Sequence, residues 1–327
     1  PQGSAGRIIT LALRAQVQLK RMDEARKLLQ ELYRVGAQQE LGQGVLPILR
    51  EMGGQLHEQI RRLERQGPAA QKELEQTKRS FQTFLDDISK DPKLPSEFRV
   101  WIITSYQSIG DFESAAKLAT ALREETAKTI QAGPPAAEGA DAEQKKKAFD
   151  EAQRLFPQVL YLEIDNLRQH ARRVLKEKGH KEAAPLFEQA HKILAAGMKQ
   201  AKLEKHPQYI ALRLLLLQDQ EYYSGPRGAI AGWDNLRAAL QPHLERGGVI
   251  RRVYLDACFN LVYCKYQEAR RLPDDESKKR ALRSTAELLA TFWTDSDLQP
   301  RLREFLEDAD TKDLLPYWEE VRKQRGF

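Results

Sequence analysis

The hydrophobic positions of this chain recur at steps of three and four residues over almost its whole length. In the segment 22–35, Ala25, Leu28, Leu29 and Leu32 fall on one face of a helix, and polar residues fill the other faces. The strand pattern, in which apolar and polar residues alternate, does not extend over six positions anywhere in the sequence. The pattern therefore predicts an all-α protein without a β-sheet.

Glycine and proline separate the periodic segments and leave short connections between them. Helices joined by short turns pack as antiparallel hairpins, so the pattern predicts about seven hairpins. The pair Gly53-Gly54 predicts a kink or break in the third helix, because each glycine costs roughly 1 kcal/mol relative to alanine. The predicted helices lie near 6–20, 22–35, 43–66, 70–90, 97–109, 112–131, 157–178, 181–204, 208–223, 227–245, 249–270, 276–293, 298–308 and 312–324.

One stretch, 132–144, differs from the rest. Its residues are small or polar, it contains two prolines, and it has no large apolar side chain. Such a segment cannot bury enough surface to order itself, so we expect a mobile loop there. The loop divides the chain into an N-terminal helical-repeat lobe at 1–131 and a C-terminal one at 145–327. The last helices, which contain Trp318, are expected to close the second lobe as a cap.

A recurring motif places a small residue early in the second helix of a hairpin. The clearest copy has Gly110 in the turn and Phe112 directly after it, and the small residues are Ala25, Ala115, Ala183 and Ala229. A small side chain lets two antiparallel helices approach closely, and the aromatic residue fills the space beside the turn. These residues resemble tetratricopeptide repeats. The resemblance implies a right-handed α-solenoid, a TPR-like superhelix of about seven helical hairpins, although the anchors are not evenly spaced at the family's period of about 34 residues.

The composition excludes several classes of protein. The chain has 327 residues, 41% hydrophobic and 31% charged, which excludes wholesale disorder. Its longest leucine run covers only 214–217, so no transmembrane helix is expected. The six histidines and two cysteines lack the spacing of a zinc site, and no local motif indicates a catalytic nucleophile or a phosphate loop. We therefore expect no cofactor, no metal and no enzymatic activity.

Three cations, Arg168, Arg172 and Lys176, follow one another at steps of four along one helix. The resemblance implies that these positions face the concave groove, where family members hold an extended peptide. It implies the same for corresponding positions of other hairpins, and the candidate groove residues are Arg14, Thr104, Arg168, Arg172, Lys176, Gln218 and Tyr222. The alternative is an ordinary solvated stripe that is partly neutralised by Glu163, Asp165 and Glu177. The Lys-and-Asn clamp of family members that grip chaperone tails is not reproduced.

The sequence thus favours a protein–protein interaction scaffold that binds a peptide or partner helix, with an acidic partner favoured by the basic stripe. Such a scaffold is either free-standing or the repeat arm of a larger protein. A nucleic-acid binder that uses the net charge of +6 is the alternative, but no aromatic residue lies among the three cations to stack on bases. An enzyme with its site between the lobes is a third reading. The chain opens on Pro1 without methionine, which leaves room for a removed signal or an upstream region, and the cytoplasm is the favoured localisation.

Overall fold

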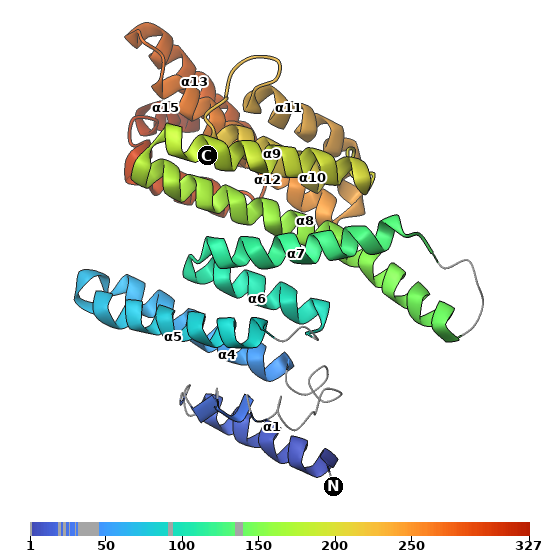
Figure 1. Cartoon of the computed structure of the whole chain (residues 1–327). Helices are drawn as coiled ribbons and strands as arrows, with labels where there is room; N and C mark the ends of the chain where they lie inside the picture. Colours follow the sequence, from blue (N-terminus) through green and yellow to red (C-terminus); the bar gives the residue numbers. More distant parts are fainter. Residues whose placement is uncertain are drawn as a thin grey trace. The chain divides into compact units, whose positions relative to one another are not determined.

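The computed structural model of the chain describes residues 2–18, 21, 24–25, 27–29, 31, 46–90, 94–134 and 140–327. These residues form α-helices joined by turns and short 3-10 segments, and none of them lies in a strand (Figure 1). The all-α prediction is therefore confirmed. The elements are α1 (Gln2–Gln18), α4 (Leu46–Arg65), η2 (Gly67–Ala70), α5 (Gln71–Ser89), α6 (Ser96–Ile109), α7 (Phe112–Gln131), α8 (Ala140–Lys178), α9 (His180–Gln200), α10 (Pro207–Asp219), α11 (Ala229–Leu240), η3 (Gln241–Arg246), α12 (Gly248–Arg270), α13 (Asp275–Phe292), α14 (Gln299–Glu307), η4 (Ala309–Thr311) and α15 (Leu315–Arg325).

Helix ends follow the local chemistry of the sequence. Helix α6 ends where Gly110 takes the left-handed conformation, with φ at 80°. Asp111 then caps α7, because its carboxylate accepts a hydrogen bond at 3.1 Å from the backbone N–H of Ser114. Both ends lie close to the predicted limits. The predicted helix at 22–35 falls mostly outside the described residues, although Ala25 is described and buried.

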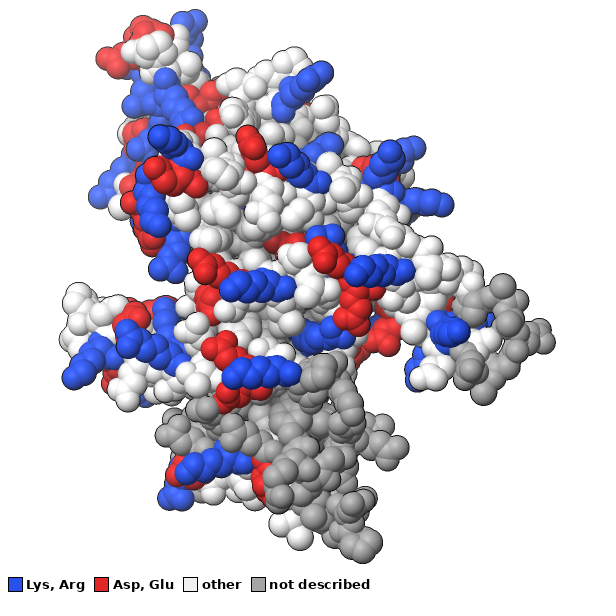
Figure 2. Space-filling model, in the orientation of Figure 1, with Lys and Arg blue, Asp and Glu red and all other residues white. Residues whose placement is uncertain are grey.

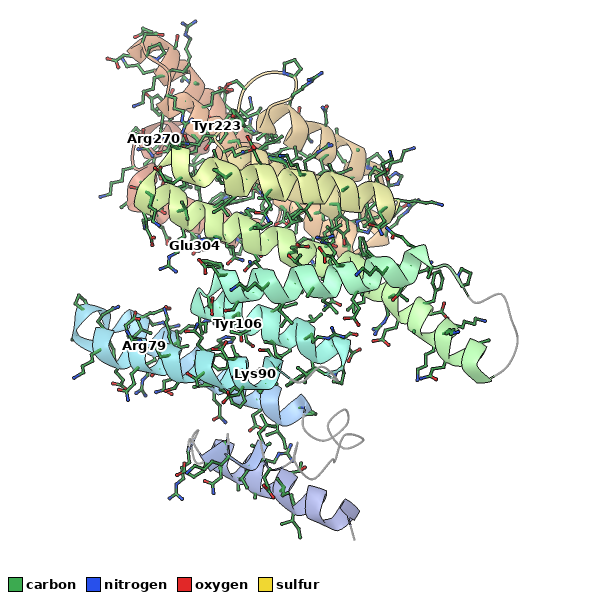
Figure 3. The ribbon with its side chains drawn as sticks, in the orientation of Figure 1. Arg79, Lys90, Tyr106, Tyr223, Arg270 and Glu304 are labelled. Carbon is green, nitrogen blue, oxygen red and sulfur yellow. The ribbon has the colours of Figure 1, made fainter. Side chains whose placement is uncertain are left out.

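The chain divides into two compact units, Pro1–Asn166 and Leu167–Phe327. In the first unit, α4 packs against α5, both contact α6, and α6 packs against α7. Ala115 and Ala119 on α7 are fully buried, as expected for small residues at a close helix contact. Tyr106 on α6, labelled in Figure 3, donates its hydroxyl proton to Asp86 on α5 over 2.7 Å. Consecutive helices from α4 to α7 therefore contact one another, and α4 also contacts α6.

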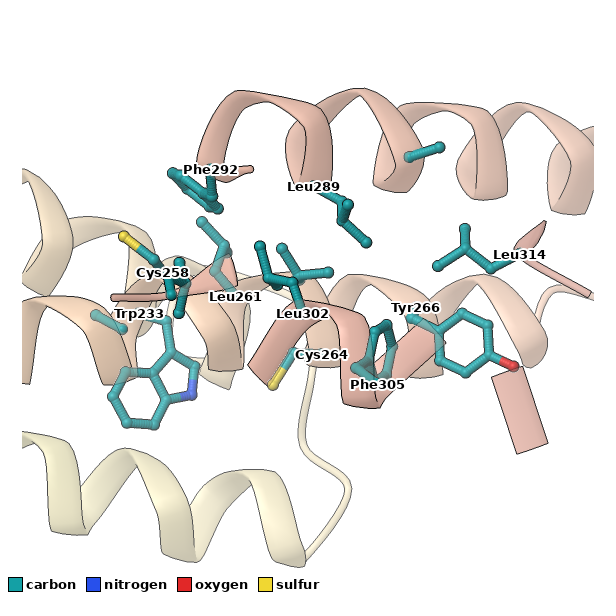
Figure 4. Packing of buried hydrophobic residues seen from close by; sticks show 14 of the residues in the cluster. Trp233, Cys258, Leu261, Cys264, Tyr266, Leu289, Phe292, Leu302, Phe305 and Leu314 are labelled. Atoms are coloured by element: carbon teal, nitrogen blue, oxygen red, sulfur yellow. The ribbon is translucent and has the colours of Figure 1, made fainter. Parts of the chain in front are cut away.

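In the second unit, α10 contacts α9, α11 and α12, α12 packs against α13, and α13 packs against α15. Trp233 and Tyr266 are the largest fully buried side chains, and both lie in the core shown in Figure 4. The anchors Ala183 and Ala229 are also fully buried. The buried apolar residues of α10 to α15 form one continuous core.

Helix α8 begins at Ala140, well before the predicted start at 157, so the last residues of the expected loop are helical. Pro157 lies inside the helix, although proline usually ends or kinks one. The part of α8 before Pro157 is held in place by burial, because Ala152, Leu155 and Phe156 all pack into the interior of their unit. Of the expected loop, 135–139 lies outside the described residues, and the boundary between the compact units falls inside α8, between Asn166 and Leu167.

The predicted break at Gly53-Gly54 is wrong, because α4 continues through both glycines. A Cβ atom on Gly53 would lie 2.8 Å from Cζ2 of Trp101 on α6. Glycine is therefore needed for the close approach of α4 to Trp101, and the packing of the two helices offsets its low helix propensity.

Candidate functional site

The cationic stripe of α8 contains two arginines in different environments. The Nε atom of Arg168 lies 2.5 Å from Oδ2 of Asp219, and the two side chains are only 13% and 9% exposed. Asp219 is the last residue of α10, where the helix dipole disfavours a negative charge. The Arg168 guanidinium offsets that cost, so this pair joins α8 to the end of α10 and is part of the packed structure.

Arg172, one turn further along α8, lies at the surface. Its Nε atom is 3.7 Å from Oδ1 of Asp219, beyond hydrogen-bond distance, and its side chain is 57% exposed. Lys176, another turn on, is also exposed. Asp219 therefore accepts a short, charge-assisted hydrogen bond from Arg168. The Arg172 guanidinium, which has five N–H donors, lies beside this pair and faces solvent.

The turn after α10 holds a second set of charges. Glu221 has a positive φ of 65°, a conformation that usually requires glycine. Its carboxylate lies 2.6 Å from Nη2 of Arg271, which follows α12, and 3.4 Å from Nε2 of His180, at the start of α9. The bond to Glu221 raises the pKa of the Arg271 guanidinium. Glu221 thus connects three helices at the position where the α10 backbone reverses.

Tyrosines surround these charges. Tyr222 is 61% exposed, whereas Tyr223 is buried with the Arg271 guanidinium 5.0 Å from its ring centroid. Burial raises the pKa of Tyr263 on α12, and the positive charge of the nearby Arg172 lowers that pKa by a smaller amount. Figure 3 labels Tyr223 and, at the end of α12, Arg270. An open cavity of about 400 Å³ adjoins this turn and is lined by Glu221, Tyr222, Tyr223, Glu268, Arg271 and Leu272, among others.

Two of the three acids that were expected to neutralise the stripe, Glu163 and Glu177, have partners outside it. Glu163 is fully buried, where its carboxylate accepts hydrogen bonds from Thr120 at 2.7 Å and Arg123 at 2.5 Å. Glu177 pairs with Arg173, one turn earlier on α8, at 2.9 Å. The structure places a further carboxylate, Asp219, against the stripe. It lies 51 residues from Arg168 along the chain, so helical spacing gave no signal for it.

The remaining candidate groove residues are in varied settings. Gln218 is buried in the core, where it accepts a hydrogen bond at 3.1 Å from Nε1 of Trp233. Thr104 is half-buried and donates its hydroxyl proton to the Trp101 carbonyl oxygen at 2.8 Å. Arg14 is exposed on α1. Arg168, Arg172, Lys176 and Tyr222 belong to the second unit, which also contains Asp219, and Gln218 does not reach its surface.

Other chemistry has little support in the part of the chain that the structure describes. There, no three His, Cys, Asp or Glu side chains are grouped so that they could hold a metal ion. None of the described helices combines the length and the apolar character needed to cross a membrane. Cys258 and Cys264 are buried, and burial raises the pKa of both thiols, to about 11 for Cys258. Protonated, buried thiols are poor nucleophiles.

Comparison with known proteins finds no family model, no curated protein and no solved structure that matches the chain. The likeness to tetratricopeptide repeats therefore depends on the residues quoted above.

Proposed function

We propose that this chain is a non-enzymatic interaction module that binds an acidic peptide or partner helix along the side of the second unit where Arg172 lies. The observation that carries the proposal is the division of roles between the two arginines. Arg168 is nearly buried against Asp219, whereas Arg172 presents its guanidinium to solvent within 4 Å of the same carboxylate. A carboxylate of the partner would accept hydrogen bonds from the N–H groups of Arg172, which Asp219 is too far away to accept.

We further propose that the helices stack as TPR-like hairpins in a right-handed α-solenoid. Support comes from the contacts between consecutive helices in α4 to α7 and in α9 to α13, from the contact of α10 with α12, and from the buried alanine anchors at the hairpin turns. A solenoid offers a long curved surface, which suits an extended segment better than a small molecule. Such a surface would place Arg172, Lys176 and Tyr222 where one segment could contact all three.

A protein partner fits the surface charge better than nucleic acid does. On the face shown in Figure 2, basic and acidic side chains are interspersed, and many blue side chains lie beside red ones. Proteins that bind nucleic acid usually gather their Lys and Arg residues on one face. The contacts of Arg172, Arg251 and Arg271 with carboxylates follow the interspersed pattern.

A direct test uses a fluorescein-labelled peptide of alternating glutamate and glycine, with fluorescence anisotropy at low salt. We expect the chain to bind this peptide, and Arg172→Gln to weaken binding about tenfold, because a charge-assisted hydrogen bond contributes about 1.5 kcal/mol or more. Arg79→Gln, which removes an exposed arginine from α5, is the matched control and should leave affinity unchanged.

Besides a failure of the wild-type chain to bind the peptide, two outcomes would contradict the proposal. One is an equal affinity of the wild-type chain and Arg172→Gln for the peptide. The other is tighter binding to a random oligonucleotide than to the peptide, with a salt dependence equivalent to several phosphate contacts, which would favour the nucleic-acid alternative.

A further inference from the structure

We infer that the cavity at the α10–α11 turn binds a basic side chain, Arg or Lys, of the same segment whose acidic residue contacts Arg172. The inference rests on the proposed function and adds the chemistry of a second contact. It gives the bound segment a polarity, with a carboxylate for the α8 stripe and a cation for the cavity.

The electrostatics of the cavity support a cation. Glu221 already contacts two basic groups, Arg271 and His180. Glu268 on α12 instead accepts a hydrogen bond from the hydroxyl of Ser224, a neutral donor that does not cancel the carboxylate charge. A carboxylate has about four acceptor sites, so Glu268 has capacity for a guanidinium or an ammonium group beside that bond.

The aromatic and apolar walls also suit a long basic side chain. Tyr222 lines the cavity and is largely exposed, so its ring is accessible to a cation, and Leu272 offers an apolar surface for the methylene stem. Contacts between a cation and an aromatic ring already occur in the second unit. Arg271 lies over Tyr223 at 5.0 Å, and Arg301 lies over Phe259 at 4.4 Å.

Backbone hydrogen bonds fix the shape of the cavity before any ligand arrives. The N–H of Ala229 donates to the Tyr222 carbonyl oxygen at 2.8 Å, and the N–H of Gly228 donates to the Gly225 carbonyl oxygen at 3.0 Å. A Cβ atom on Gly228 would clash with the carbonyl oxygen of Ser224, so only glycine allows this close turn. A preformed cavity loses little entropy on binding, which favours affinity.

The experiment compares the glutamate–glycine peptide with two variants that carry one arginine, at the amino end or at the carboxyl end. Net charge alone predicts that the added arginine weakens binding, because it reduces the attraction to the basic stripe. We expect the opposite: one arginine variant should bind the wild-type chain about fivefold more tightly than the parent peptide. Fluorescence anisotropy measures all three affinities.

Two substitutions assign the gain to the cavity. Glu268→Gln, which removes the charge and keeps the shape, should abolish the preference for arginine and leave the affinity for the parent peptide unchanged. Tyr222→Ser should reduce the preference at a largely exposed position where folding is not at risk. Glu304→Gln is the matched control, because Glu304 is exposed on α14 and does not line the cavity (Figure 3).

The outcomes separate the two proposals. If the wild-type chain binds the parent peptide but shows no preference for either arginine variant, the inference about the cavity is wrong and the proposed function stands. If the wild-type chain binds none of the three peptides, both are wrong. A preference that survives in Glu268→Gln and in Tyr222→Ser would place the arginine elsewhere and would overturn the inference.

Discussion

The different roles of Arg168 and Arg172 give a prediction for stability. Replacing Arg168 with Gln removes the short bond to Asp219 from an almost solvent-free position. A hydrogen bond to a charged group contributes about 1.5–3 kcal/mol, and breaking a buried ion pair costs up to about 5 kcal/mol. Because Arg172 lies 3.7 Å from the same carboxylate and can move closer, it recovers part of the loss. We therefore expect Arg168→Gln to lower the free energy of unfolding by about 2 kcal/mol.

Arg172→Gln should change that free energy by less than about 0.5 kcal/mol, because the contact is long and the side chain is mostly exposed. The double substitution should cost about 1 kcal/mol more than the sum of the two single ones, since Arg172 can no longer replace Arg168. Arg283→Gln, which breaks an exposed pair with Glu320, is the control for loss of a surface arginine.

Urea unfolding followed by far-ultraviolet circular dichroism measures all four variants. The slope of the free energy against urea should stay constant, so that the midpoints report stability directly. If Arg168→Gln unfolds at the wild-type midpoint, or if Arg172→Gln costs as much as Arg168→Gln, the assignment of one arginine to the structure and the other to binding is refuted.

Three further predictions concern pH, the turn and the cap. Burial raises the pKa of the Cys258 thiol from 9.0 to about 11, so the folded state holds this proton more tightly than the unfolded state does. The stability that results is fully present below pH 9.0 and is lost as the pH rises towards about 11. The melting temperature should therefore decrease between pH 9.0 and about 11 and should stay constant just below pH 9.0. Gly228→Ala should destabilise the chain by more than about 1 kcal/mol and abolish the preference for arginine-bearing peptides, because its Cβ would meet the Ser224 carbonyl oxygen; a wild-type melt and preference would argue against a fixed turn. Deleting 297–327 removes α14 and α15, including the buried Trp318, and should cause aggregation in size-exclusion chromatography, whereas an unchanged elution profile would contradict the role of these helices as a cap.

The sequence was sufficient for the fold class and for most helix limits, because periodicity and breakers are local signals. Gly110, for example, ends α6 where the sequence places the turn. Local signals did not predict the helix limits correctly where a contact between residues far apart in the sequence determines them. Helix α8 continues through Pro157 because its residues pack into the interior of their unit, and α4 passes Gly53 because Trp101 lies against it.

The candidate site was harder to predict than the fold, because its side-chain contacts also come from residues far apart in the sequence. Arg168 and Arg172 are identical in type and one helical turn apart, so nothing in the sequence separates a buried arginine from an exposed one. The difference comes from Asp219, which folding brings from another helix. Glu163 illustrates a signal that was available: it lies five residues before Arg168, which places it about 140° around the helix and away from the stripe.

The most direct measurement of the central claim, that Arg172 contacts a carboxylate of the partner, is a charge exchange. Arg172→Glu should weaken binding of the glutamate–glycine peptide at least tenfold and should strengthen binding of a lysine–glycine peptide of equal length. Arg79→Glu, with the same change in net charge on α5, should leave both affinities near their wild-type values. If the two variants shift both affinities equally, the peptides respond to overall charge only, and the proposal of a site at Arg172 is wrong.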